Sequence, residues 1–302
     1  MKKGILATAI LTSLISIFTP NTSLPVSNTS LPISDKSEIR VGDFQWRNLE
    51  EGLSFARIPA MAGRDTVEIA SVVKIDPKLY TFKPSFDYNS KSINEWQEQL
   101  NSPVLINASY WEPDYTPTNH LVMEGQLFIG QFPRAQESIY KKFEDKPKGT
   151  FIAGNLDDFL GDVDILGTNE TPDFSNPRYE TMVESWPMLI QDGKIITEQD
   201  TWIANRTIIG ITEDKQVIFA LTEIGDNLSL YETTNFLDRA CNLTDALNMD
   251  GGIASEMAIS TTNLNYTITG TYEAGHAIGK IRTKKGTQIP IPSVIGIYPI
   301  TN

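Results

Sequence analysis

Short runs of alternating or β-branched apolar residues dominate the sequence beyond its first forty residues. Side chains of this kind pack well on the pleated surface of a sheet, so the runs predict strands rather than helices. Polar turns at residues 191–194 and 213–215 separate neighbouring runs, as in antiparallel hairpins. The predicted strands cover residues 53–58, 67–75, 103–106, 120–128, 207–212, 217–222 and 294–299.

Two helices are predicted within this strand-rich pattern. Ser92 with Glu95, and Ser229 with Glu232, have the capping-box spacing in which two side chains satisfy free backbone amides at a helix start. The second helix is predicted to end near Cys241. Its inward-facing residues are predicted to be Leu230, Phe236, Leu237 and Ala240. The sequence therefore predicts an α+β fold: a mixed, largely antiparallel β-sheet core with a few packing helices, in a single domain.

The N-terminal forty residues differ from the rest. Lys2 and Lys3 precede an apolar run that is short for a membrane span but typical of a secretory signal, so residues 1–19 are predicted to be a signal peptide. Asn-Thr-Ser-Leu-Pro occurs twice within residues 20–40, which predicts a flexible linker. Residues 41–302 are predicted to form the folded domain. No small-x-small cleavage site is evident, so an uncleaved leader that tethers the protein to a membrane stays open.

Charge and cysteine content exclude several classes of protein. Lys and Arg number 25 and Asp and Glu 38, a formal charge of −13, whereas general nucleic-acid binding relies on positive charge. Cys241 is the only cysteine, so no intrachain disulfide can form, and its place on the second helix favours packing over catalysis. His120 and His276 lie in no nucleophile-elbow or zinc-binding pattern. A secreted or cell-envelope protein, from a bacterium by the form of its leader, is the resulting expectation.

Residues 245–255 are the most informative stretch. A predicted strand ends there at Asn248, and Asp250 is followed by two glycines that allow positive φ and close approach of the backbone to a ligand. An isolated Asp-Gly-Gly would be interpreted as a plain turn. Three further unusual segments, at residues 107–126, 185–193 and 206–210, favour a functional site instead.

In their order along the chain, these segments resemble the phosphodiester glycosidase family. Its pattern includes Asn, small residue, Gly and aromatic, matched from Asn107; Pro-x-Leu-x-x-Asp-Gly, matched by residues 187–193 as Pro-Met-Leu-Ile-Gln-Asp-Gly; Arg-Thr-x-x-Gly, matched from Arg206; and Asn-x-Asp-Gly-Gly-x-x-Ser, matched from Asn248. The resemblance covers most of residues 50–300.

Three departures from the family pattern affect the expected substrate more than the fold. Ser109 and His120 stand where the family usually has glycine, so the loop between them is expected to differ in shape. Ala254 replaces one of two hydroxyl residues, which leaves Ser255 as the matched hydroxyl.

The resemblance implies cleavage of a sugar C1–phosphate bond with the phosphate group leaving. Because the second pKa of a phosphomonoester is about 6, a cation beside this group matters more than a strong general acid. Arg206 is the candidate cation, with a structural ion pair as the alternative. Asp250 would stabilise positive charge at the anomeric carbon, attack it as a nucleophile or activate water. Glu184 or Glu124 would be the second carboxylate, although each equally suits a solvated charge.

The same resemblance implies a set of substrate-binding residues. Asn107 and Asn248 would orient sugar hydroxyls, and Gly251 and Gly252 would offer backbone amides to an anion. The full set of candidates is Asn107, His120, Glu124, Thr207, Asn248, Gly251, Gly252 and Ser255.

Two functional hypotheses remain at this point. The first is a secreted hydrolase of sugar 1-phosphodiesters, with a glycan or sugar phosphate as substrate and no nucleic-acid partner. The second is a catalytically silent carbohydrate-binding or envelope-assembly protein. Asp250 and amide oxygens could hold a divalent cation, but no compact ligand motif indicates one, no cofactor is certain, and the oligomeric state is open.

Overall fold

The computed structural model describes residues 38–112, 114–129, 146–156, 163–167, 169–170, 172–200, 202–275 and 279–300. From Glu38 onward the chain forms one compact unit. The predicted signal peptide, most of the predicted linker and His276 lie outside the described residues. Arg40, the last residue of the predicted linker, is already the first residue of a strand.

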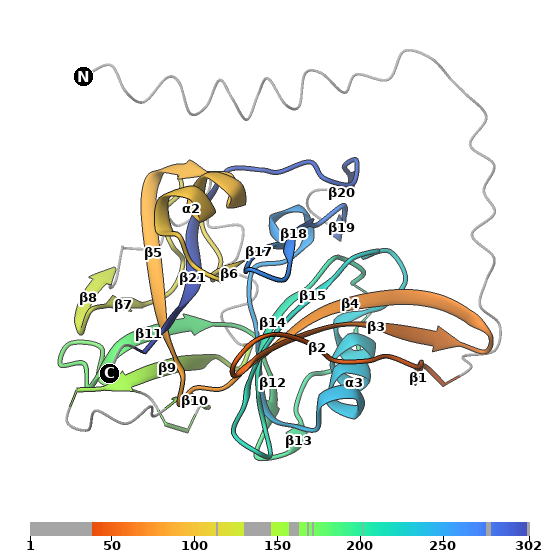
Figure 1. Cartoon of the computed structure of the whole chain (residues 1–302), viewed down its shortest axis with the longest axis horizontal. Coiled ribbons are helices and arrows are strands. Elements are labelled where there is room, and N and C mark those ends of the chain that lie inside the picture. Colours follow the sequence, from red (N-terminus) through yellow and green to blue (C-terminus); the bar gives the residue numbers. More distant parts are fainter. Residues whose placement is uncertain are drawn as a thin grey trace, which may run out of the picture. The chain divides into compact units, whose positions relative to one another are not determined.

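The largest sheet has nine strands (Figure 1). Its order is β1-β3-β4-β15-β14-β16-β12-β13, with β2 alongside β3. These strands are β1 (Arg40–Val41), β2 (Arg47–Glu50), β3 (Leu53–Ala62), β4 (Asp65–Ile75), β12 (Met188–Gln191), β13 (Lys194–Ile195), β14 (Thr207–Thr212), β15 (Val217–Thr222) and β16 (Leu243–Asn248). Polar turns join β12 to β13 and β14 to β15, where the sequence predicts them.

Two five-stranded sheets and a two-stranded sheet complete the strands. One has the order β10-β9-β11-β7-β8, and the other β18-β17-β6-β21-β5. Their strands are β5 (Tyr80–Lys91), β6 (Val104–Asn107), β7 (Leu121–Met123), β8 (Gln126–Ile129), β9 (Gly149–Asn155), β10 (Val163–Leu166), β11 (Tyr179–Ser185), β17 (Glu256–Ser260), β18 (Asn265–Thr269) and β21 (Ile291–Pro299). The small sheet pairs β19 (Tyr272–Gly275) with β20 (Gly279–Arg282).

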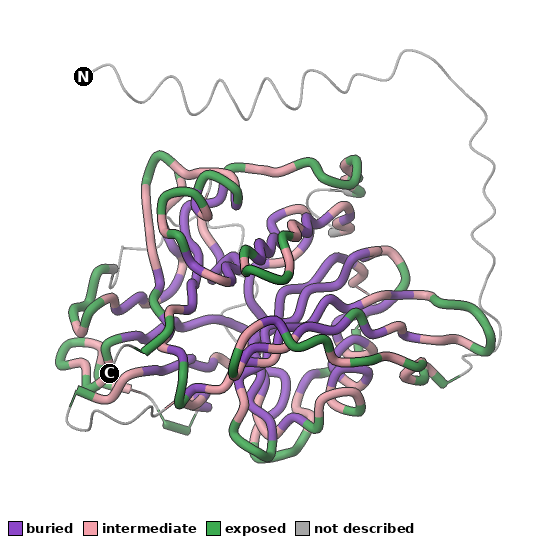
Figure 2. Tube along the Cα trace, viewed as in Figure 1, coloured by how far each residue is buried: buried purple, intermediate pink, exposed green. Residues whose placement is uncertain are grey.

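The three larger sheets share one hydrophobic core. Phe82 of β5 contacts Phe151 of β9 and Phe219 of β15 edge to face, with ring centroids 5.4 and 5.8 Å apart. The buried residues run along the middle of the strands (Figure 2). Every residue of β14 and β15 is buried, because this core covers one face and a second hydrophobic cluster covers the other.

The two helices close the outer faces of the sheets. Helix α3 (Leu230–Cys241) packs Phe236 and Leu237 against Ile208 and its neighbours on the nine-stranded sheet. Helix α2 (Ile93–Leu100) packs Trp96 against the sheet that contains β6 and β17. Both begin with the predicted capping boxes. All strand pairs among the described residues are antiparallel, and the α+β prediction is confirmed.

Two local predictions are corrected. The strand predicted at residues 120–128 is a hairpin, because Glu124 and Gly125 have φ values of 52° and 71° and turn the chain between β7 and β8. In α3, Ala240 is only partly buried, whereas Thr234 is buried. The Thr234 hydroxyl donates to the Leu230 carbonyl at 2.8 Å, which satisfies its polar group inside the packed face.

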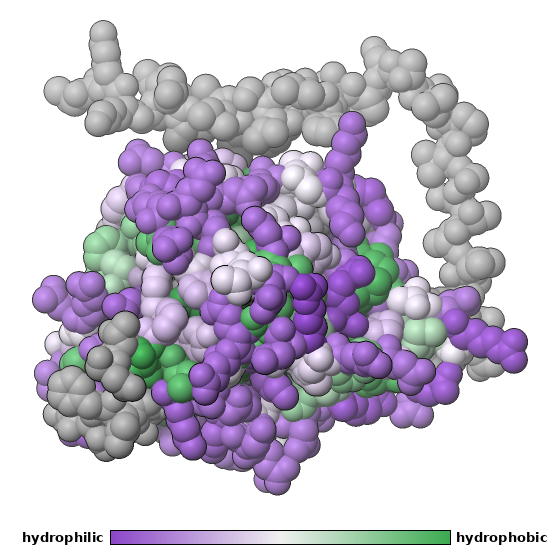
Figure 3. All heavy atoms as spheres, in the orientation of Figure 1, coloured by the Kyte–Doolittle hydropathy of each residue, from purple (hydrophilic) through white to green (hydrophobic). Residues whose placement is uncertain are grey.

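The surface in Figure 3 is mostly hydrophilic, with hydrophobic residues in small groups. Within the described part of the chain, neither helix has the length and apolar character needed to span a bilayer.

Candidate functional site

The two glycines after Asp250 let two other segments come close to this turn. A Cβ added to Gly251 would lie 2.9 Å from the Asn205 carbonyl oxygen, and one added to Gly252 would lie 2.4 Å from Glu273 Oε2. Gly252 also has φ +64°, where a side chain would be strained. The glycines therefore admit a neighbouring backbone and a neighbouring carboxyl group.

The amides of these glycines do not match the prediction that they bind an anion. The Gly251 N–H donates to Asp250 Oδ1 at 2.8 Å, and the Gly252 N–H donates to the Asn205 carbonyl at 2.8 Å. Both donors are therefore used within the protein. Gly251 and Gly252 shape the turn.

Asp250 is buried at the start of this turn, directly after the central strand β16. Burial raises its pKa well above the ordinary value, and the negative charge of Glu273 raises it further. Hydrogen bonds from the Gly251 amide and the Trp111 side chain act in the opposite direction. Asp250 thus favours its protonated form more strongly than an exposed carboxyl group does.

Glu273, in β19, is the second carboxylate at this turn. Burial raises its pKa, while the charge of Arg206 and a hydrogen bond from the Ile253 amide lower it. Sequence reasoning missed this residue, because it lies in none of the matched motifs and follows Asp250 by 23 residues. The folded chain brings its segment against the turn, where Glu273 Oε2 would lie 2.4 Å from a Cβ added to Gly252.

Arg206 lies next to the Asp250 turn, and it has Glu273 as a charged neighbour. Burial lowers its pKa, whereas the charges of Tyr110, Asp200 and Glu273 raise it. Its Nη2 donates to the Trp202 carbonyl at 2.6 Å, and its buried Nε has no hydrogen-bond partner. A guanidinium stays charged under all ordinary conditions, so Arg206 keeps donor capacity and a positive charge beside two carboxyl groups.

Tyr110 and Asn248 form the adjoining part of the site. The Asn248 amide nitrogen donates to the Tyr110 hydroxyl, and the Tyr110 ring stacks on Trp186 with centroids 4.3 Å apart. Burial raises the pKa of Tyr110, and the charge of Asp250 adds to this effect. Tyr110 is therefore neutral.

Unused hydrogen-bonding capacity gathers in this region. Five buried side-chain atoms of the described residues have no partner, and three belong to predicted site residues: Arg206 Nε, Asn248 Oδ1 and Ser255 Oγ. Buried polar atoms are normally paired, so a group of unpaired ones is a place where water or a ligand can complete the bonding.

Asn107 and Thr207 differ from this group. The Asn107 amide nitrogen donates to the Asp250 carbonyl at 2.8 Å, and its oxygen accepts from Thr207 Oγ1 at 2.7 Å and the Glu256 amide at 3.0 Å. Both residues are buried. Asn107 and Thr207 thus fix the backbone of the Asp250 turn with polar groups that are occupied inside the protein, and their substrate-binding role stays a prediction.

Glu184 belongs to a separate cluster. Its Oε2 lies 2.8 Å from His120 Nδ1, and its Oε1 lies 3.5 Å from Lys148 Nζ. Burial would raise the pKa of Glu184, but the bond with His120 and the charge of Lys148 bring it below the ordinary value. The His120 ring stacks on Phe174. Glu184 is therefore a paired, stabilised carboxylate, which is a weak base and a poor acid, and its catalytic role stays a prediction.

Glu124 is not near these groups either. It lies on the exposed turn between β7 and β8, beyond the three residues of β7 that separate it from His120. Three strand residues span about 10 Å, so the turn carries Glu124 away from the His120 cluster. Its role as a second carboxylate stays a prediction, and Glu273 is the carboxylate whose charge acts on Asp250.

No group of three or more His, Cys, Asp or Glu side chains that could hold a metal occurs in the described residues. Glu273 has Arg206 as its cationic neighbour.

Comparisons with known proteins agree with the motif order. The phosphodiester glycosidase family matches residues 101–298. No curated protein matches the sequence.

Three solved structures share the fold. A hypothetical protein from Synechocystis has 11% identity and a TM-score of 0.55, with 88% of this chain and 68% of that chain covered. The catalytic domain of zebrafish N-acetylglucosamine-1-phosphodiester alpha-N-acetylglucosaminidase has 13% identity and a TM-score of 0.53, with 88% and 85% covered. A putative exported protein from Burkholderia pseudomallei has 8% identity and a TM-score of 0.52, with 93% and 99% covered. Because the match covers more than half of this chain, the chain belongs to the phosphodiester glycosidase family.

Proposed function

We propose that this chain is an exported hydrolase that cleaves the glycosidic bond of sugar 1-phosphodiesters in cell-surface or extracellular glycans. The observation that carries the proposal is the grouping of Asp250 and Glu273 beside Arg206, whose Nε is buried and unpartnered. Family membership supports a glycosidase, and the form of residues 1–19 supports export.

Arg206 would recognise the phosphate group of the substrate. A guanidinium can bind two phosphate oxygens through parallel hydrogen bonds, and Arg206 has its Nε free for one of them. Its positive charge would also stabilise the leaving group as negative charge develops on it.

Asp250 and Glu273 would carry out the proton transfers. Their raised pKa values favour the retention of one proton by the pair, which then offers one acid and one base at the same place. In the overall reaction the bond between C1 and the phosphate oxygen breaks, and its electron pair leaves with the phosphomonoester. The oxygen of water bonds to C1, and its proton passes to a carboxylate of the pair.

Asn248, Tyr110 and Ser255 would bind the sugar. Asn248 Oδ1 and Ser255 Oγ are buried without partners, and the neutral Tyr110 hydroxyl lies against the Asn248 amide. Such groups match the hydroxyls of a sugar in donor and acceptor character.

A catalytically silent carbohydrate-binding or envelope-assembly protein is the second candidate. The observation that favours it is His120, which occupies a usual glycine position of the family and is held by Glu184. A loop of different shape would let the protein bind the glycan without cleaving it.

The test is a panel of α- and β-linked sugar 1-phosphodiesters, incubated with and without a chelator, with release of the phosphomonoester as the readout. We expect hydrolysis of at least one compound, and loss of hydrolysis in Glu273→Gln. Binding of a panel member by calorimetry without any release would select the second candidate. Activity that disappears with chelator would instead add a divalent cation to the site.

A further inference from the structure

The segment that carries Glu273 has little sheet structure to hold it. Among the described residues, strand β19 pairs with β20 alone in a two-stranded sheet, apart from a single bridge between Ala204 and Glu273. Two strands by themselves are marginally stable in water. Other contacts must therefore fix Glu273 beside Asp250 and Arg206.

The buried side chain of Asn205 provides such contacts. Its Oδ1 accepts from the Thr271 amide at 2.7 Å and from the Tyr272 amide at 2.9 Å. Its own backbone N–H donates to the Tyr272 carbonyl at 3.1 Å. Asn205 thus binds Thr271 and Tyr272, the two residues immediately before Glu273, through both its side chain and its backbone.

The remaining polar groups of Asn205 bind two other parts of the site. Its Nδ2 donates to the Thr222 carbonyl at the end of β15, at 2.5 Å, and its carbonyl accepts from the Gly252 amide. Gly225 makes room for this arrangement, since a Cβ there would lie 2.3 Å from Asn205 Oδ1. One residue therefore joins β15, the Asp250 turn and the Glu273 segment.

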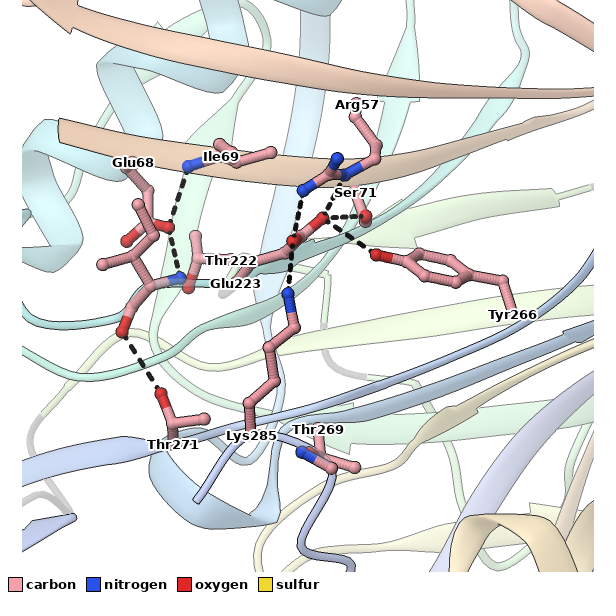
Figure 4. A network of polar contacts seen from close by, with 12 residues as sticks. Arg57, Glu68, Ile69, Ser71, Thr222, Glu223, Tyr266, Thr269, Thr271 and Lys285 are labelled. Carbon is pink, nitrogen blue, oxygen red and sulfur yellow. Dashed lines mark hydrogen bonds and ion pairs between the residues drawn. The ribbon is translucent and has the colours of Figure 1, made fainter. Parts of the chain in front are cut away.

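Contacts farther out are weaker. Figure 4 shows Thr271 and Lys285 reaching the residues that follow β15: Thr271 Oγ1 donates to the Ile224 carbonyl at 3.3 Å, and Lys285 Nζ lies 3.6 Å from Glu223 Oε2. The Lys285 side chain is 75% exposed, and exposed ion pairs contribute little. The buried hydrogen bonds of Asn205 are the better source of a fixed position.

We propose that Asn205 is a positioning residue, which fixes the Glu273 carboxyl group against Asp250 and Arg206. The inference rests on the proposed function only for its effect on turnover. Asn205 acts through the Thr271–Tyr272 backbone, and all the polar groups of its side chain are used within the protein.

The test compares Asn205→Ala with Ser102→Ala. The Ser102 hydroxyl also takes part in three buried hydrogen bonds, with the Val104 carbonyl and with the carbonyl and amide of Ile297. Ser102 precedes β6, at the opposite end from Asn107. Both variants are expected to lower the melting temperature, and Ser102→Ala is expected to leave turnover and the Glu273 titration unchanged.

In Asn205→Ala, kcat is expected to fall about 100-fold while KM stays within about threefold, since a displacement of about 1 Å has effects of this size. The Glu273 carboxyl carbon, assigned in NMR spectra with the aid of Glu273→Gln, is expected to titrate at lower pH than in the wild type. The groups that face Glu273 are Arg206, Asp250 and Tyr110, and loss of the Asn205 bonds lets water reach the carboxyl group between them.

Unchanged titration and unchanged kcat in a folded Asn205→Ala would overturn the proposal. If Asn205→Ala does not fold, Asn205→Asp keeps a side-chain oxygen that can accept from both the Thr271 and Tyr272 amides, and it replaces the nitrogen that donates to the Thr222 carbonyl by a second oxygen. The Thr271 and Tyr272 amides should then stay protected from hydrogen exchange, and rapid exchange of both would overturn the proposal. A wild type without hydrolysis whose Glu273 titration still shifts in Asn205→Ala would refute the proposed function and support the positioning role.

Discussion

The Asp250–Glu273 pair and the Glu184 cluster place carboxylates in opposite electrostatic states. Glu184 accepts hydrogen bonds from His120 and has Lys148 nearby, so its pKa falls although burial acts against this. Asp250 has the negative charge of Glu273 nearby, Glu273 has the buried Arg206 as its cationic neighbour, and burial raises both carboxyl pKa values. Stable ionisation suits a carboxylate that holds structure, and costly ionisation suits a carboxylate that transfers protons.

A third carboxylate strengthens this comparison. Glu223 is almost completely buried, yet bonds from Arg57 and Ser71 lower its pKa against the effect of burial. The Arg57 guanidinium donates a hydrogen bond to each of the two Glu223 oxygens, both at 2.7 Å. Burial alone therefore does not separate the two states, since at Glu223 the bonds from Arg57 and Ser71 outweigh it.

The largest expected effect is that of Asp250→Asn on turnover. An amide can neither transfer a proton nor act as a nucleophile, so kcat should fall by about 1,000-fold or more, while substrate binding is retained better. Steady-state kinetics and calorimetry on the folded variant measure both. Hydrolysis close to the wild-type rate would move the catalytic centre away from this turn.

The second-largest expected effect is that of Arg206→Lys, which should decrease kcat/KM about 100-fold. Lysine keeps the charge but cannot bind two phosphate oxygens in parallel, and it loses the planar fork that reaches the Trp202 carbonyl. Kinetics with the best substrate of the panel provide the measurement. The matched control is Arg57→Lys in the Glu223 cluster, for which we expect turnover to be unchanged.

The contributions of Asp250 and Glu184 to stability should also change with pH in opposite directions. The raised pKa of Asp250 means that its contribution to stability is present at low pH and is lost as pH rises through the folded-state pKa. Asp250→Asn should therefore gain stability relative to the wild type as pH rises. The lowered pKa of Glu184 means that its contribution is present above the ordinary carboxyl value and is lost as pH falls through the folded-state pKa.

Glu184→Gln should accordingly be less stable than the wild type at neutral pH, by about 1–3 kcal/mol, and the difference should shrink in acid. Thermal unfolding of the wild type and both variants, between about pH 3 and pH 8, checks the two signs together. The kcat of Glu184→Gln should change less than tenfold, because Glu184 is paired with His120 and Lys148. Equal pH trends in both variants would remove the distinction between the two groups.

Cys241→Ala should have the smallest effect. Burial raises the pKa of the Cys241 thiol to about 12, so it is a poor nucleophile at neutral pH. We expect a change in stability of about 1 kcal/mol or less and unchanged turnover. Inhibition by a thiol reagent that disappears in this variant would place Cys241 beside the site.

Much of the fold could be predicted from local pattern. The helix starts at Ser92 and Ser229 depend on residues three positions apart, and the runs at residues 207–212 and 217–222 have the continuous apolar character of strands covered on both faces. The break at Glu124 and Gly125 was not predicted as a hairpin, because apolar residues on both sides suggested one continuous strand.

The site was predictable only in part. Asp250, Arg206, Asn248 and Ser255 lie within matched motifs, and the structure places the first two in one cluster. Glu184 follows the same logic of position, but its neighbours His120 and Lys148, which come just before β7 and β9, turn it into a paired carboxylate. Partner identity depends on contacts across strands, which a linear pattern does not contain.

The sequence by itself determined the sheet-rich class, the two helices and the Asp250 turn, because strand alternation, capping and glycine conformations are local properties of the chain. Tertiary structure decided which carboxylate completes the site. Glu273 meets Asp250 and Arg206 only where β19 folds back over the turn, and its pKa depends on the burial and charges found there. Those interactions act over a few ångströms in space between residues distant in sequence, and they exist only once the chain has folded.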